Sequence, residues 1–112
     1  MKSLKIYGLP VVVSNRYRIV LDKNIRSLYN IKKNDEVLMN ITEDFISISE
    51  SRQEKSSGEK KKITIGRFNL PASWANRNKI KIGDFVCLVA TDTGIIICPQ
   101  NSELVCIGGL NQ

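Results

Sequence analysis

The sequence contains an internal repeat. The stretch from Arg18 to Ile48, shifted by 49 positions (67 minus 18), aligns without a gap on the stretch from Arg67 to Ile97. Other positions keep only their apolar character, as where Ile25 is matched by Trp74. A duplication of this kind requires a fold assembled from two like units. The identical pairs are Arg18/Arg67, Leu21/Leu70, Ile31/Ile80, Lys32/Lys81, Asp35/Asp84, Val37/Val86, Thr42/Thr91, Ile46/Ile95 and Ile48/Ile97.

The two copies are expected to share one core. A unit of about 45 residues buries too little of its surface to be stable alone. We therefore predict one domain, with a first repeat at 1–49 and a second repeat with a C-terminal tail at 63–112. Residues 50–62 between them contain no aliphatic or aromatic side chain and are predicted to be a charged, flexible linker.

Each copy has the pattern of a strand, a short helix and two further strands. In the first copy, apolar and polar residues alternate from Arg16 to Leu21, which indicates a half-buried strand. Asp22 is a typical N-terminal cap for a short helix over Lys23–Tyr29. Apolar residues on both sides of Thr42–Asp44 predict a hairpin. The fold class is therefore mostly β with short helices, and Leu104–Ile107 can add a short edge strand after the second copy.

Charge and composition narrow the function. The chain has 17 Lys and Arg against 11 Asp and Glu, and the net charge of +6 favours a polyanionic partner. It has no His, which removes the usual general base and the commonest metal ligand, so we expect no enzyme, cofactor or metal site. No long apolar run predicts a membrane span. The first ten residues lack the apolar core of a signal peptide, so we expect a cytoplasmic protein.

The three cysteines do not suggest a metal site either. Cys87, Cys98 and Cys106 are odd in number and lack the C-x-x-C spacing that zinc sites use. Cys87 and Cys98 are equally distant from the centre of the predicted hairpin around Asp92 and Thr93, so they should face each other on adjacent strands. Both a cross-strand disulfide and two buried free thiols fit that position, and the thiols are the favoured interpretation.

The order of the motifs resembles the AbrB/SpoVT swapped-hairpin family. That family's pattern is Gly-Arg, an apolar strand, Pro, a short helix, and an apolar-x-x-Gly-Asp-x-Val turn. The second copy matches it at Gly66, Arg67, Leu70, Pro71, Ile80, Gly83, Asp84 and Val86. The first copy matches less literally, at Arg18, Leu21, Lys23, Ile25, Arg26, Ile31, Asp35 and Val37, with Tyr17, Asp22 and Asn34 in place of the Gly, Pro and Gly.

The resemblance implies a fold and a ligand. The fold is a swapped-hairpin, AbrB-like β-barrel made of two interleaved copies, which are usually two chains of a homodimer. Here the two copies lie in one chain, so we expect an intrachain pseudo-dimer. A homodimer of chains that each give two half-barrels is the alternative. Members of the family include transition-state regulators, MazE-type antitoxins and tandem-copy MraZ-like proteins, in which basic residues near the first strand and helix bind duplex DNA.

Basic residues at these places are therefore the candidates for DNA binding. Arg suits bidentate contact with a phosphate or a guanine edge, and Lys suits phosphate. For Arg18 and Arg67 the alternative is an ion pair with Asp35 or Asp84, although each aspartate can also accept backbone N–H bonds in its turn. The candidates are Arg16, Arg18, Lys23, Arg26, Lys32 and Lys33 in the first copy, with Arg67 and Arg77 in the second.

The copies differ in charge. Where the first has Lys23 and Arg26, the second has Ala72 and Ala75, so the first copy should dominate any contact with DNA. Trp74 is predicted to anchor the core rather than to stack on a base.

The sequence thus predicts a DNA-binding transcriptional regulator that contacts double-stranded DNA through the first repeat. The alternative is a protein–protein interaction module, such as an antitoxin bound to its toxin or an inhibitor of a partner enzyme. The near-neutral second copy and the apolar run Ile95–Ile97 favour that alternative modestly.

Overall fold

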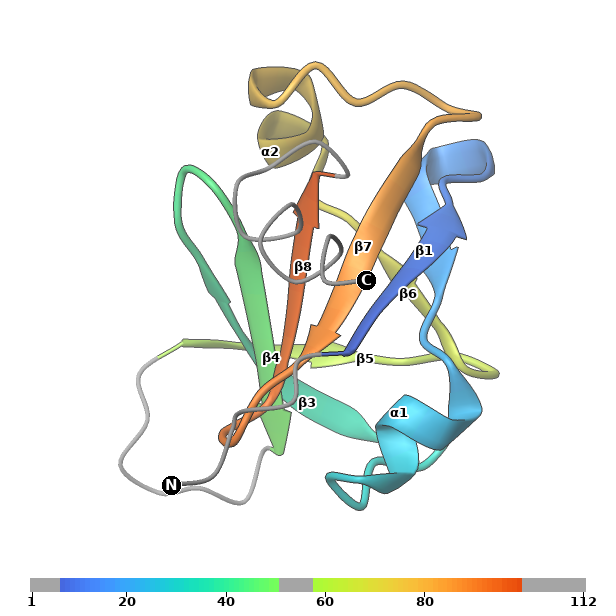
Figure 1. Ribbon diagram of the computed structural model, residues 1–112, viewed down its shortest axis with the longest axis vertical. Helices are drawn as coiled ribbons and strands as arrows, with labels where there is room; N and C mark the ends of the chain where they lie inside the picture. Colours follow the sequence, from blue (N-terminus) through green and yellow to red (C-terminus); the bar gives the residue numbers. More distant parts are fainter. Residues whose placement is uncertain (1–6, 51–57, 100–112) are drawn as a thin grey trace.

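The computed structural model of the protein describes residues 7–50 and 58–99 (Figure 1). This part of the chain is mostly β, with two short α-helices and antiparallel sheets, as predicted. The elements are β1 (Tyr7–Val12), a 3-10 turn (Asn15–Tyr17), β2 (Arg18–Val20), α1 (Lys23–Ser27), β3 (Glu36–Ile41), β4 (Ile46–Glu50), β5 (Glu59–Lys62), β6 (Arg67–Asn69), α2 (Ala72–Arg77), β7 (Phe85–Ala90) and β8 (Ile95–Pro99).

The two repeats exchange strands. The larger sheet has the order β1-β7-β8-β4-β3-β5, and β2 pairs with β6 in a separate two-stranded ribbon. The strand that precedes the first repeat, β1, therefore lies against β7 of the second, and β5 lies against β3 of the first. Each repeat is completed by a strand from the other half of the chain.

The predicted closed barrel is not found among the described strands. β1 and β5 are the two edges of the larger sheet, and no pairing joins them. Each edge strand leads through a tight turn into β2 or β6. The β2–β6 ribbon, rather than a β1–β5 ladder, thus completes the enclosure of the interior.

A pseudo-two-fold axis relates the two repeats. β3 and β7 have the same bounds when shifted by 49 positions, and so do β4 and β8. Two facing pairs consist of residues that are equivalent in the repeat: Ile19 with Phe68 in the ribbon, and Ser47 with Ile96 in the large sheet. The axis must pass through both pairs, so the repeats are interleaved about it.

The turns before β2 and β6 differ in length by one residue. Val13 N donates to Asp84 O over 2.8 Å, and Ile63 N donates to Asp35 O over 2.9 Å, so upstream of the ribbon the shift is 50 rather than 49. In both turns two consecutive residues are left-handed: Arg16 and Tyr17 have φ of 66° and 55°, and Ile65 and Gly66 have 50° and 74°. Such a pair makes a tight reversal between antiparallel segments. The first ribbon strand consequently begins at Arg18, not at Arg16 as predicted.

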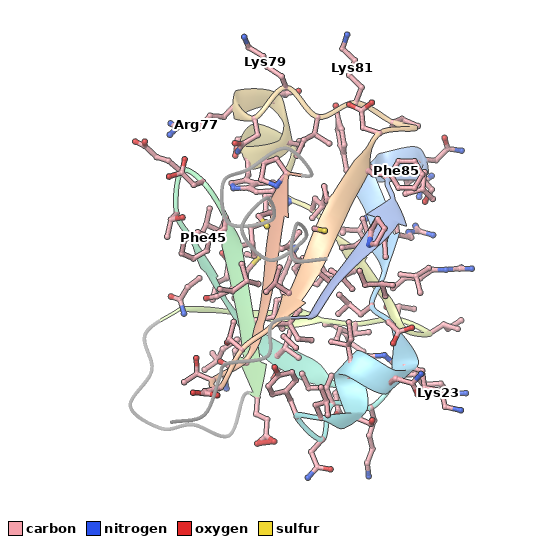
Figure 2. The ribbon with its side chains drawn as sticks, viewed as in Figure 1. Lys23, Phe45, Arg77, Lys79, Lys81 and Phe85 are labelled. Carbon is pink, nitrogen blue, oxygen red and sulfur yellow. The ribbon has the colours of Figure 1, made fainter. Side chains whose placement is uncertain are left out.

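One apolar core spans both repeats, which confirms the predicted shared interior (Figure 2). Ile19 and Phe68, on the axis, are 1% and 0% exposed. Trp74 belongs to this core, as predicted, and its Nε1 has no hydrogen-bond partner among the described residues. The other fully buried large side chains are Leu21, Ile46, Ile48, Ile63, Leu88, Ile95, Ile97, Val13, Val37 and Val86.

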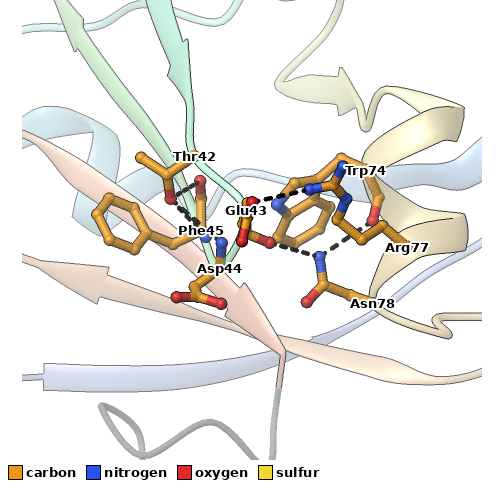
Figure 3. Close-up of polar contacts among 7 residues, drawn as sticks. All are labelled: Thr42, Glu43, Asp44, Phe45, Trp74, Arg77 and Asn78. Atoms are coloured by element: carbon orange, nitrogen blue, oxygen red, sulfur yellow. Dashed lines mark hydrogen bonds and ion pairs between the residues drawn. The ribbon is translucent and has the colours of Figure 1, made fainter.

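The tip of each hairpin is fastened to the helix of the other repeat. Tyr29 Oη, just after α1, donates to Thr91 O over 2.6 Å. At the equivalent place after α2, Asn78 Nδ2 donates to Glu43 O over 3.1 Å, and Arg77 pairs with the Glu43 carboxylate at 3.4 Å (Figure 3). These contacts cross between repeats in both directions, and so reinforce the strand exchange.

The local predictions are partly confirmed. Asp22 caps α1, because its Oδ2 accepts from Ile25 N at 3.0 Å. The helix ends at Ser27, two residues before the predicted end, and Asn30 follows it in the left-handed conformation with φ 60°. The predicted linker at 50–62 instead holds β5, because Glu59–Lys62 pair with β3. Cys106, Leu104–Ile107 and the rest of the predicted tail lie outside the described residues.

Substitution of Gly94 should disturb the join between the two repeats. A Cβ at Gly94 would collide with the carbonyl oxygen of Ile48, in the strand that β8 pairs with. We expect Gly94→Ala to lower the free energy of unfolding by about 1–3 kcal/mol, as overpacking does. The matched control is Gly8→Ala, whose Cβ would lie 3.6 Å from Cys87 Sγ, an ordinary contact. Equal effects of the two variants in urea denaturation would contradict the β4–β8 pairing.

Loss of the Tyr29 hydroxyl should remove the hydrogen bond that joins the end of α1 to the tip of the β7–β8 hairpin. Burial raises the pKa of Tyr29, and the negative charge of Asp92 adds to this. Tyr29→Phe should cost about 1 kcal/mol at neutral pH. Because the pKa is higher in the folded state, the unfolded chain ionises first, and folding stability falls as pH rises above about 10. The difference between wild type and variant should therefore shrink at high pH; a difference that grows there would contradict this account.

Candidate nucleic-acid interface

The β2–β6 ribbon has one buried face and one face toward solvent. Ile19 and Phe68 point into the core. Neighbouring positions on a strand point the other way. The outer face is therefore formed by two cross-strand pairs, Arg18 with Asn69 and Val20 with Arg67. Three of these side chains are exposed, and Arg18 is half-buried. Asn69 was not among the predicted residues; it could have been found only by knowing that the two strands pair.

The strand exchange brings Arg67 to the basic residues of the first repeat. In the turn before β6, Gly66 N donates to Lys33 O and Gly66 O accepts from Leu21 N, both at 2.8 Å. Ile65 N donates to Asn34 Oδ1, also at 2.8 Å. The turn that precedes Arg67 is thus seated on the loop that carries Lys32 and Lys33. The predicted first-copy cluster is in fact completed by an arginine of the second copy.

The other end of the ribbon carries Arg16 and Arg18. Asn69 Nδ2 donates to Arg16 O over 3.2 Å, and Leu70 N donates to Tyr17 O over 2.8 Å, so this end is seated next to α2. Here the repeat supplies fewer cations. Residues equivalent to Lys23, Arg26 and Lys33 are Ala72, Ala75 and Ile82. Arg77, Lys79 and Lys81 follow in the second copy, so the two ends of the ribbon differ in which positions carry the charge.

Arg26 has a structural role that its sequence position did not reveal. Its Nε donates to Leu21 O over 2.8 Å. Its Nη2 would be 3.3 Å from a Cβ built on Gly66, so the guanidinium lies against the turn before β6. Arg26 is half-buried and joins α1 to the residues that flank the two strands of the ribbon. Direct contact of Arg26 with DNA stays a prediction.

The aspartates that follow the helices shape turns. Asp35 Oδ2 accepts from Lys32 N and Asp84 Oδ2 accepts from Lys81 N, each at 2.8 Å, which confirms the predicted backbone bonds. Neither aspartate pairs with Arg18 or Arg67. Within residues 7–50 and 58–99 the ion pair is that of Arg77 with Glu43. The ribbon arginines therefore keep their charge available.

Arg77 is set apart from the other candidates. Figure 2 places it on the opposite side of the molecule from Lys23 on α1. Its side chain is 58% exposed and that of Glu43 is 79% exposed, so their ion pair contributes little to stability. The structure brings Arg67 to the basic residues of the first copy, whereas Arg77 lies at the tip of the β3–β4 hairpin, next to Glu43.

The remaining ionisable groups form no further site in the described ranges. There, no group of three or more Cys, Asp or Glu could hold a metal ion. Nor is any helix of that part of the chain long and apolar enough to cross a membrane. Cys87 and Cys98 face each other across β7 and β8, as predicted, and both are buried; burial raises the pKa of the Cys87 thiol.

Comparisons of the chain with known protein families, with characterised proteins and with solved structures gave no match. Its function is therefore inferred from its own residues.

Variants of Arg26 and Arg67 should differ in folding stability, because Arg26 supports the fold and Arg67 does not. Arg26→Ala removes the bond to Leu21 O and should lower the free energy of unfolding by about 1–2 kcal/mol. Arg67→Ala removes an exposed side chain with no partner in the described ranges and should change it by less than about 0.5 kcal/mol. Chemical denaturation of both variants checks this, and an equal loss in both would refute the structural role given to Arg26.

Proposed function

We propose that this protein binds double-stranded DNA through the β2–β6 ribbon and acts as a transcriptional regulator. The observation that carries the proposal is the exposed face of the ribbon, where Arg18 and Arg67 have no ion-pair partner in the described part of the chain. A two-stranded β-ribbon is one of the elements that the major groove of B-DNA admits. Lysines on α1 and on its following loop flank the ribbon and suit the phosphate backbone.

The four outer side chains of the ribbon have the chemistry of base recognition. Arginine can donate two bonds to guanine O6 and N7, and asparagine can pair with adenine N6 and N7. Arg18 lies beside Asn69 at one end, and Arg67 beside Val20 at the other. Each end therefore has a polar side chain that can hydrogen-bond to a base edge. Val20 supplies an apolar surface of the kind that contacts a thymine methyl group. The flanking lysines hold the protein in register without reading sequence.

The finer fold assignment belongs to the same proposal. The exchange of β1 and β5 between the repeats supports a swapped-hairpin, AbrB-like architecture folded as an intrachain pseudo-dimer. That architecture, with the basic residues next to the ribbon, supports a role as a regulator rather than as an enzyme.

A mobility assay with duplex DNA at several salt concentrations tests the proposal. Affinity should fall steeply with salt, and the slope of log K against log salt should be about −0.9 per phosphate contact. Arg18→Ala with Arg67→Ala should weaken binding by about 1–3 kcal/mol for each lost base contact and relax the preference between sequences, with little change in the slope. The charge-matched control is Lys60→Ala with Lys62→Ala, on β5 at the edge of the larger sheet.

The two pairs of variants give distinct outcomes. Equal loss of affinity in both pairs would mean that net charge, not the ribbon, governs binding. Absence of any shifted DNA, together with stoichiometric capture of one protein, would select the interaction-module alternative.

A further inference from the structure

Exposed apolar side chains gather where the end of β1 meets the start of β7. Val12 and Phe85 face each other across the two strands, and they are 48% and 47% exposed. Gly83 N donates to Val13 O over 2.8 Å, so the turn that carries Ile82 lies beside the end of β1. Ile82 is 52% exposed. Val12, Ile82 and Phe85 form what we call the β1–β7 patch, and neighbouring exposed apolar residues of this kind mark an interaction site.

The first repeat shows that the fold does not require apolar residues at these positions. Glu36 and Lys62 face each other across β3 and β5, as Phe85 and Val12 do across β7 and β1. The same backbone arrangement therefore carries charge in one half of the molecule and an apolar surface in the other. The equivalents of the patch are three exposed charged residues: Glu36 for Phe85, Lys33 for Ile82 and, with the shift of 50 that applies upstream of the ribbon, Lys62 for Val12.

An open groove adjoins the patch. It lies between the residues that follow α2 and the start of β7, its volume is about 530 Å³, and Phe85 forms part of its wall. Ile80 and Pro99 contribute further apolar surface, and Lys79 and Asp84 contribute polar atoms. A concave surface with apolar walls and a few polar groups can receive a bulky side chain of a ligand.

The rim of the patch is positively charged. Lys79 and Lys81 are exposed, and Figure 2 shows them at the same end of the molecule as Phe85. Neither lysine has an ion-pair partner in the described part of the chain. The nearby Asp84 carboxylate accepts a hydrogen bond from Lys81 N over 2.8 Å and so belongs to its own turn. An apolar centre with a basic rim favours a partner that has both carboxylates and a bulky apolar side chain.

We propose that the β1–β7 patch docks an acidic segment of another protein, with a bulky apolar side chain of that partner packed on Phe85 and its carboxylates next to Lys79 and Lys81. Duplex DNA fits this surface less well, because phosphates lose hydration against apolar side chains. A second copy of the chain also fits less well, because a two-fold contact would bring the lysines of both rims together. The proposal goes beyond DNA binding by the ribbon and does not depend on it.

Selection of random displayed peptides on the immobilised full-length protein tests the proposal. Peptides that combine Asp or Glu with Trp, Phe or Leu should be enriched, and an enriched peptide, made synthetically, is the probe for titration by fluorescence anisotropy. Val12→Lys with Phe85→Glu should weaken its binding roughly tenfold or more, because both central apolar side chains are lost. This variant should fold, since it gives β1 and β7 the Lys–Glu pair that β5 and β3 already have.

The matched control is Leu28→Glu with Ile41→Lys. It replaces two other exposed apolar side chains, 64% and 46% exposed, by the same two charges, and should leave the affinity for the peptide unchanged. Ile82→Lys gives an independent variant of the patch and should also weaken binding. Equal affinity of the wild type and both patch variants would overturn the proposal. So would a selection that enriches no peptides, or only peptides without acidic residues.

Two further measurements distinguish the other occupants. We expect the wild type and the variant with Val12→Lys and Phe85→Glu to sediment alike and to give the same result in the DNA mobility assay. Self-association of the wild type that this variant loses would assign the patch to a second copy of the chain. Loss of DNA affinity in this variant would assign it to the nucleic-acid interface. Either result would overturn the proposal.

Discussion

Burial of the Ile19–Phe68 pair is the interaction on which the rest of this structure depends. The two residues are equivalent in the repeat, face each other on the pseudo-two-fold axis, and are almost fully buried. Each repeat alone would leave the apolar face of its hairpin and its ribbon strand in water. Fusion of two copies in one chain allows each to cover the other, and the exchanged strands β1 and β5 extend this cover along both edges of the sheet.

The interleaving also determines where the charge lies. Because the turn before β6 sits on the loop after α1, Arg67 joins Lys32 and Lys33 although it is far from them in sequence. A non-interleaved pair of repeats would leave each arginine with its own helix. The duplication has since diverged on two surfaces. Near the α2 end of the ribbon Ala72, Ala75 and Ile82 stand where the first copy has Lys23, Arg26 and Lys33, and the outer face of β7–β8 is apolar where that of β3–β4 is mostly polar. Both differences break, at the surface, the two-fold symmetry that the core retains.

Much of the fold could be predicted from the sequence, because the repeat and the alternation of apolar residues determine strands, helices and hairpins locally. The Asp22 cap and the facing cysteines follow from spacing alone. Strand exchange was suggested only by family resemblance, since pairing of β1 with β7 rather than β3 depends on tertiary contacts. The β5 strand was missed because lysines of low strand propensity form it at an edge, where their side chains reach water. The roles of Arg26 and Asn69 were hidden because their partners come from the turn and the strand of the other repeat.

The most direct test of the interleaved architecture is a cross-strand measurement on β1. Nuclear Overhauser effects between backbone protons should place Leu9 opposite Leu88 of the second repeat. The equivalent residue of the first repeat is Met39, which the structure instead places opposite Glu59 and Ile48. Observation of Leu9 opposite Leu88 would confirm the exchange. Observation of Leu9 opposite Met39 would show two separate half-domains and would remove the basis for a shared core and for the assembled cationic ribbon.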